Sequence, residues 1–340
     1  MGNILKNILK FILFFGIGIF FVWLSVRKLP TDGMNILGTV LMEHSQNFMF
    51  WMFLFLAFVA GGVSNYIRAL RNRQLLEPLG YVIRKNMAFY SVMVCYIANY
   101  AFPRLGEVLR CTFLQRYEKV PFDKSLGTVV AERAVDFVIM LIILAVAIFL
   151  NLSVVGALKI DGQSLVDILS GKTDAMFHSY KLYVCGGIII LLLLLIFFTK
   201  KWWQKMKFFT KISNFFLGIG KGLISVKDVK QPGLFIFYSL FIWVLWILET
   251  VFCFHAFHFL SDMTFMQMFC VFAIGNIGFL IGPGGIGTYP LIVAEMLVLY
   301  GIDYTYGFGA GWIGWGVQTA QVFILGIFSL VAVSFVKRKE

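Results

Sequence analysis

Six apolar segments constrain this chain more than any other feature of its sequence. They lie at about 8–26, 48–66, 126–150, 182–199, 233–257 and 305–336. Each reaches the roughly 17–25 mostly apolar residues that a helix needs to span a bilayer. The composition agrees, because 60% of the 340 residues are hydrophobic and only 14% are charged. A globular protein of this length cannot bury so large an excess, so we predict an all-α, polytopic transmembrane helical bundle with about six full spans.

Two further apolar segments, at about 86–102 and 265–282, are long but end abruptly. The first ends at Pro103, and the second ends in the glycine-rich run 282–287. Proline and glycine interrupt helices, so the chain is expected to break at both places. A helical pattern resumes after the breaks, at 108–117 and at 288–299.

The distribution of charge predicts the sidedness of the chain. Surplus lysine and arginine gather in 67–85, in 200–230 and at the C-terminus, whereas 27–47 and 151–180 are charge-balanced. Cytoplasmic loops of membrane proteins carry such a surplus, so we expect both termini in the cytoplasm and the protein in the cell (cytoplasmic) membrane. The net charge of +12 has the same explanation. No nucleic-acid partner is expected.

This sidedness makes both broken segments re-entrant. The flanks of 86–117 fall on the cytoplasmic side and those of 265–299 on the outer side, so two helical hairpins are expected to enter from opposite faces. The chain then forms one flippase-like membrane domain, 1–340, with pseudo-repeats at about 1–150 and 180–336. In such inverted-repeat layouts, broken helices meet near the midplane and form the substrate site.

The basic segment 200–224 has the pattern of an interfacial amphipathic helix. Its aromatic and aliphatic residues recur every three or four positions, and its lysines fall mostly between them. Such a helix inserts its apolar face and places lysines on anionic headgroups. It serves either as the anchor of a cytoplasmic loop or as a surface that gathers substrate.

No cofactor is expected. The five cysteines are scattered, without a CxxC pair or a cysteine–histidine cluster, so we predict free thiols and no metal site. The run 282–287 superficially resembles a nucleotide phosphate loop, but it lacks the Lys-Ser/Thr ending of that motif. ATP binding is therefore not predicted.

The first hairpin carries a charged motif. It comprises Asn99, Pro103, Arg104, Gly106, Glu107 and Arg110. An ionisable group costs roughly 2.5–3.5 kcal/mol at the bilayer centre, so three of them close together must pair or line water. Arg104, Glu107 and Arg110 share one helix face, and the planar guanidinium favours phosphate. The motif is either a phosphate site or an interfacial ion pair that fixes the hairpin.

A second charged motif opens the segment 126–150. Glu132, Arg133 and Asp136 lie within one helical turn. Intramembrane acids beside a basic hairpin are natural partners for it and are also able to carry protons. The alternative is that they only hold the hairpin and the span together.

The third motif belongs to the second hairpin and contains Asn276, Gly284, Gly285 and Gly287. Dense glycines before a helix that starts at about 288 expose backbone N–H groups, which together form an anion cradle. The alternative is a tight turn without a ligand.

In this order, the three motifs resemble the lysylphosphatidylglycerol synthase transmembrane-region family, a flippase-like membrane domain. The resemblance spans nearly the whole chain and implies lipid transport. In that family the domain is associated with the translocation of aminoacylated phosphatidylglycerol, and other members are linked to polyprenyl- or dolichol-phosphate sugar pathways.

Two features depart from the family pattern. The chain ends at Glu340 directly after the last span, so we expect neither the aminoacyl-transferase domain of bifunctional members nor synthesis of an aminoacyl lipid. Relatives tend to carry an acid soon after the last glycine of the third motif. Here Tyr289 and Pro290 occupy that stretch, and the next acid is Glu295.

The leading hypothesis is a transporter rather than an enzyme: a translocase for a phosphate-bearing lipid, such as a phospholipid or a polyprenyl-phosphate-linked species. Its partners would be membrane lipids and their anionic headgroups. Arg104, Arg110 or Arg133 would bind the phosphate. The acids Glu107, Glu132 and Asp136 would balance the arginines, bind a cationic group or take up protons. The alternatives are a membrane-embedded transferase, with Glu107 or Asp136 as base, and an accessory protein of envelope lipid or glycan biosynthesis.

Overall fold

The computed structural model describes residues 16, 18–101, 105–150, 159–160, 163–164, 229–281 and 283–336. Chain contacts divide the protein into two units, Met1–Asn151 with Gly222–Glu340 and Leu152–Lys221. In the second unit, β1 (Lys159–Ile160) pairs antiparallel with β2 (Gln163–Ser164). The expected amphipathic helix at 200–224 and the expected span at 182–199 lie outside the described residues.

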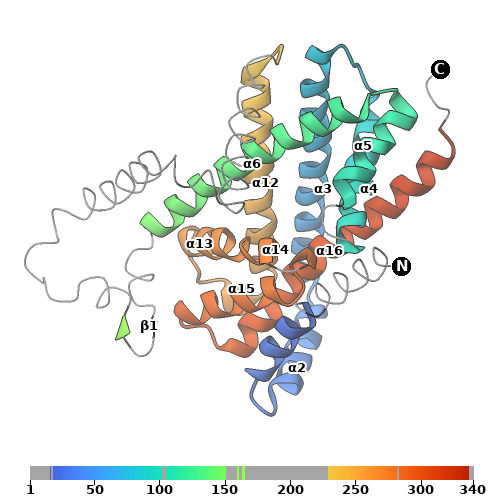
Figure 1. Ribbon diagram of the computed structural model, residues 1–340. Coiled ribbons are helices and arrows are strands. Elements are labelled where there is room, and N and C mark those ends of the chain that lie inside the picture. The colour runs from blue at the N-terminus through green and yellow to red at the C-terminus, as the bar shows by residue number, and fades with distance from the viewer. Residues whose placement is uncertain are drawn as a thin grey trace, which may run out of the picture. The chain divides into compact units, whose positions relative to one another are not determined.

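The described part of the first unit is built from helices (Figure 1). A short apolar helix, Gly18–Arg27, precedes the labelled elements. The first half continues with α2 (Gly33–Ser45), α3 (Phe48–Leu76), η1 (Glu77–Leu79), α4 (Lys85–Ala101), α5 (Leu105–Glu118) and α6 (Phe122–Leu150). The second half contains α12 (Pro232–His255), η3 (His258–Leu260), α13 (Phe265–Gly275), α14 (Gly278–Ile281), η4 (Pro283–Gly285), α15 (Thr288–Leu299) and α16 (Tyr304–Ser334).

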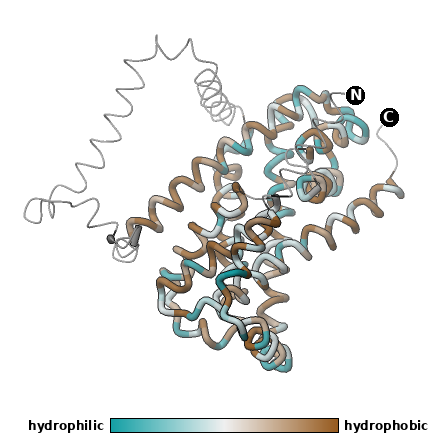
Figure 2. Tube along the Cα trace, turned by 60° about the horizontal axis from the view of Figure 1, so that its bottom comes forward, coloured by the Kyte–Doolittle hydropathy of each residue, from teal (hydrophilic) through white to brown (hydrophobic). Residues whose placement is uncertain are grey.

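Four helices are long and apolar enough to cross a bilayer. They are α3 with η1, α6, α12 and α16. Large hydrophobic side chains remain exposed along them, among them Phe149 on α6, Phe237 on α12 and Phe328 on α16. Figure 2 shows long hydrophobic stretches along the helices. Such surfaces suit lipid, so the prediction of a helical membrane protein is confirmed, while the total of six spans stays a prediction.

The helix α3 corrects the sequence interpretation. The span was expected to end near residue 66 and to be followed by a basic loop at 67–85. Instead the helix continues to Leu76, and Arg68 and Arg71 are buried inside the bundle. Arginine is a good helix former, and both guanidinium groups find partners on other helices, so their charge does not end the helix.

The second broken segment also differs in detail from its prediction. The apolar helix expected at 265–282 ends already at Gly275, and α14 follows as a separate short turn. At the break, Asn276 donates from Nδ2 to the carbonyl oxygen of Phe272 at 2.7 Å. An asparagine side chain that bonds nearby backbone competes with helix continuation. The helix expected at 288–299 is present as α15.

The two halves repeat one order of elements: a long helix, a broken helical pair and a second long helix. The first long helices, α3 and α12, pack antiparallel. The rings of Phe53 and His255 lie 5.8 Å apart at one end, and Arg71 donates to Ser239 at the other. In an inverted repeat, equivalent helices run in opposite directions. The packing therefore favours that layout, and the repeat itself stays a prediction.

The two breaks contact each other. The ring of Tyr100, at the end of α4, lies where a side chain on Gly284 of η4 would be, 2.8 Å from the position of a Cβ atom. Trp315 of α16 donates from Nε1 to the carbonyl oxygen of Gly284 at 2.9 Å. Tyr100 of the first broken segment and Gly284 of the second are thus neighbours.

Candidate functional site

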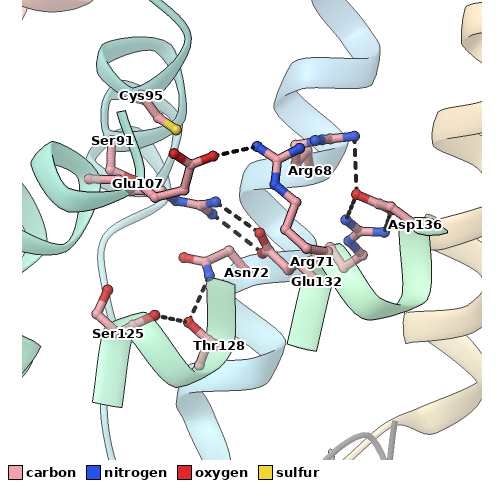
Figure 3. A network of polar contacts seen from close by, with 12 residues as sticks. Arg68, Arg71, Asn72, Ser91, Cys95, Glu107, Ser125, Thr128, Glu132 and Asp136 are labelled. Atoms are coloured by element: carbon pink, nitrogen blue, oxygen red, sulfur yellow. Dashed lines mark hydrogen bonds and ion pairs between the residues drawn. The ribbon is translucent and has the colours of Figure 1, made fainter. Parts of the chain in front are cut away.

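The helix α6 presents three of its charged residues, Glu132, Arg133 and Asp136, to two different helices. Asp136 faces α3, where Arg71 donates to both of its carboxylate oxygens, at 2.7 and 3.0 Å (Figure 3). A second guanidinium, that of Arg68, lies 3.4 Å from the same carboxylate. Arg71 also donates to Ser239 Oγ of α12 at 3.3 Å. One carboxylate on α6 therefore joins to two arginines of α3 and, through Arg71, to α12.

Glu132 faces α5 and forms a second two-pronged pair. Arg110 donates to its two oxygens at 2.8 and 3.3 Å. Each side chain is only 4% exposed. Pairs of this geometry are the strongest arginine–carboxylate contacts, and burial makes each partner costly to remove alone. This pair fixes the second helix of the broken segment to α6.

Arg133 and Glu107 form a third and more open pair. Arg133 donates from Nη2 to Glu107 Oε1 at 3.1 Å, and its side chain is 48% exposed. The same oxygen accepts from Asn99 Nδ2 at 3.4 Å. The other oxygen, Oε2, is buried without a hydrogen-bond partner. Glu107 therefore retains acceptor capacity beside the most accessible arginine of the three pairs.

Local packing explains how α4 and α5 bring these groups together across the break. Gly106 donates its N–H to Asn99 Oδ1 at 2.9 Å, which ties the start of α5 to the end of α4. A Cβ atom on Gly106 would lie only 2.0 Å from the carbonyl oxygen of Cys95. Only glycine permits so close an approach of the two backbones.

The network holds four arginines and three carboxylates, a surplus of one positive charge. Arg68 is bound least completely. Its Nε and Nη2 lack hydrogen-bond partners, and its guanidinium lies over the rings of Trp246, at 4.8 Å, and Tyr96, at 5.7 Å. A buried guanidinium with free donors between aromatic rings is suited to an anion.

The structure brings together most of the predicted charged residues and adds two. Glu107, Arg110, Glu132, Arg133 and Asp136 all join the network, and Asn99 contacts Glu107. Arg104 lies outside the described residues. Sequence reasoning assigned Arg68 and Arg71 to a cytoplasmic loop. Their signal was a helical pattern that continues past residue 66 with both arginines three positions apart.

Among the described residues, the glycines of the third motif make no hydrogen bond or ion pair with this network, and they serve close packing. Gly284, Gly285 and Gly287 all have positive φ, between 56° and 73°. Their open sides are covered: Tyr100 lies against Gly284, Phe279 against Gly285, and the backbone of residues 21–22 against Gly287. Asn276 bonds within its own helix. An anion cradle at this motif stays a prediction.

Comparison with known proteins agrees with the three motifs. No curated protein and no solved structure matches the chain significantly. One family model, described as the lysylphosphatidylglycerol synthase TM region, matches residues 7–326. That range contains every residue of the charged network and the glycine run. The match covers nearly the full length, so this chain belongs to the lysylphosphatidylglycerol synthase TM region family.

Proposed function

We propose that this membrane protein translocates a phosphate-bearing lipid, either a phospholipid or a polyprenyl-phosphate-linked species, across the cell membrane, with both termini in the cytoplasm. The observation that carries the proposal is the largely buried network on α3, α5 and α6, whose arginines outnumber its acids by one. Charged groups within membrane segments are rare and mark substrate pathways. Family membership supports a role in lipid biosynthesis or lipid flipping.

Arg133 is the residue best suited to the first contact with a lipid phosphate. Its side chain is half exposed on a membrane-spanning helix, and among the described residues its hydrogen-bond partner is Glu107 alone. Arg110, in contrast, is buried and donates from both terminal nitrogens to Glu132. A phosphate at Arg133 would gain a charge-assisted hydrogen bond without breaking a buried ion pair.

Arg68 would take the phosphate further into the bundle. Its Nε has no hydrogen-bond partner, and its Nη2 makes the longest ion pair of the network, 3.4 Å from Asp136. With its aromatic surroundings, this guanidinium offers a second anion position. Glu107, with one free oxygen, would bind a cationic or hydroxyl group of the same headgroup. The phosphate would therefore enter at the exposed face of α6, bind Arg133 first and then move to Arg68.

Reconstitution in vesicles tests this proposal. Purified protein is placed in phosphatidylcholine vesicles that contain fluorescent phosphatidylglycerol. An impermeant quencher added outside reaches only the outer leaflet, so translocation of inner-leaflet lipid should accelerate the loss of fluorescence. The Arg133→Ala variant should be about tenfold slower or worse, because a hydrogen bond to a charged group contributes about 1.5–3 kcal/mol. Arg116→Ala, which removes an exposed arginine of α5 outside the network, should keep the wild-type rate.

Three results would speak against the proposal in different ways. Absence of translocation for phospholipids and polyprenyl phosphates alike would remove the transport function. Wild-type rates in both Arg133→Ala and Arg68→Ala would remove the site. Formation of a new lipid product from a supplied donor would favour a transferase instead.

A further inference from the structure

Glu249 is a buried acid that the charged network leaves out. It lies in the membrane-spanning helix α12 and is 2% exposed. Its Oε1 has no hydrogen-bond partner, and none of the ion pairs between described residues includes it. It differs in this from Glu107, Glu132 and Asp136, each of which has an arginine partner.

The missing side chain of Gly61 leaves room for the Glu249 carboxylate. A Cβ atom on Gly61 of α3 would lie 2.8 Å from Glu249 Oε2 and 2.2 Å from Gln321 Nε2 of α16. The amide of Gln321 is already engaged, because its Nε2 donates to the Phe58 carbonyl at 2.7 Å and its Oε1 accepts from Asn65 at 3.2 Å. The polar group beside the carboxyl at Gly61 is thus an uncharged amide.

Three ionisable side chains near Glu249 are the thiol of Cys253 on α12 and the phenols of Tyr289 on α15 and Tyr100 on α4. Thiols and phenols are neutral at ordinary pH. The helices α13 and α16 contain no charged residue at all. On α3, the guanidinium of Arg68 is held by Asp136 and the Trp246 ring. No cation in the described part of the chain is therefore placed to neutralise Glu249.

We propose that Glu249 is a proton-binding site that couples lipid translocation to the proton gradient. A buried carboxylate without a counter-ion is strongly disfavoured, whereas the protonated acid is neutral and donates one hydrogen bond. The acid holds its proton in the conformation seen here. It releases the proton when α3 and α12 separate enough to admit water.

The helix α3 links this site to the charged network. Gly61 lies next to Glu249 and Gln321, and Asn65 donates to Gln321. Arg68, three residues after Asn65 on the same helix, contacts Asp136. On α12, Trp246 beneath Arg68 is three residues from Glu249, so both groups share one helix–helix interface. A shift of α3 along α12 would move both sites together. This coupling rests on the proposed transport function, whereas proton binding itself does not.

Carbodiimide labelling tests proton binding without any transport assay. Dicyclohexylcarbodiimide adds to protonated carboxyls in an apolar phase, and the adduct is located by peptide mass. In the reconstituted full chain at neutral pH, the peptide that contains Glu249 should be labelled. The Glu249→Gln variant should lose this label, and Glu43→Gln, which changes an exposed acid of α2, should keep it. No label at Glu249 in a folded wild-type protein at neutral and mildly acidic pH would overturn the proposal.

A second assay tests the coupling. Phosphatidylcholine vesicles containing fluorescent phosphatidylglycerol receive a pH gradient of either sign. The wild type should translocate lipid severalfold faster in one direction, and Glu249→Gln should lose this asymmetry while retaining exchange. An equal response of wild type and Glu249→Gln would refute coupling. If the wild type moves no lipid, the transport function fails and the labelling result alone decides the proton site.

Discussion

Arg110 and Glu132 show what a buried ion pair does at the scale of single residues. Both side chains are almost fully inaccessible and share two hydrogen bonds, so neither has another partner in the described part of the chain to take over its charge. The pair costs desolvation of both groups, and its net contribution to stability is small. Its effect appears when one partner is lost and the other remains buried with an uncompensated charge.

We predict non-additive effects of replacing these two residues. Arg110→Met and Glu132→Leu should each destabilise the protein by about 3–5 kcal/mol, because each leaves a lone buried charge. The double variant should be clearly more stable than either single variant. Thermal unfolding in detergent, followed by tryptophan fluorescence, measures all four proteins. If the double variant loses as much stability as the two single variants together, the pair does more than neutralise charge.

At the scale of elements, long apolar runs were sufficient to locate whole helices. The segments expected at 126–150, 233–257 and 305–336 correspond closely to α6, α12 and α16. Their ends are defined locally by turn residues and by the length that a bilayer requires. The end of α3 was missed because it depends on Asp136, a partner far along the chain that no local pattern identifies.

The charged network could be predicted from the sequence only in part, because its members lie on different helices. Glu132, Arg133 and Asp136 share one helical turn, so the sequence identifies them as a group. Their partners lie on other helices and cannot be identified from this pattern. Glu249 carried a signal that sequence reasoning left unused, namely a single acid in the apolar segment 233–257. Intramembrane acids are functional candidates even without a neighbouring motif.

We predict that the close contact of α4 with α5 depends on Gly106. Alanine there would place Cβ at 2.0 Å from a backbone oxygen, which cannot move without separating the helices. Gly106→Ala should therefore lower the unfolding temperature by several degrees and weaken the Glu107–Arg133 pair. The control is Gly127→Ala in α6, where nothing lies within 4 Å and alanine favours the helix. Equal stability of both variants would contradict the packing argument.

At the scale of the whole molecule, the antiparallel packing of α3 and α12 predicts which segments share a membrane face. Met42 and Asp262 are exposed near the ends where Phe53 meets His255, and Leu79 and Lys230 are exposed near the opposite ends. Single cysteines at Met42 and Asp262 should react with an impermeant maleimide in intact cells, and those at Leu79 and Lys230 only after permeabilisation. The native cysteines in the described residues are buried, so they contribute little background. Labelling of Met42→Cys and Lys230→Cys from the same side would exclude opposite crossing of α3 and α12, and the inverted repeat with it.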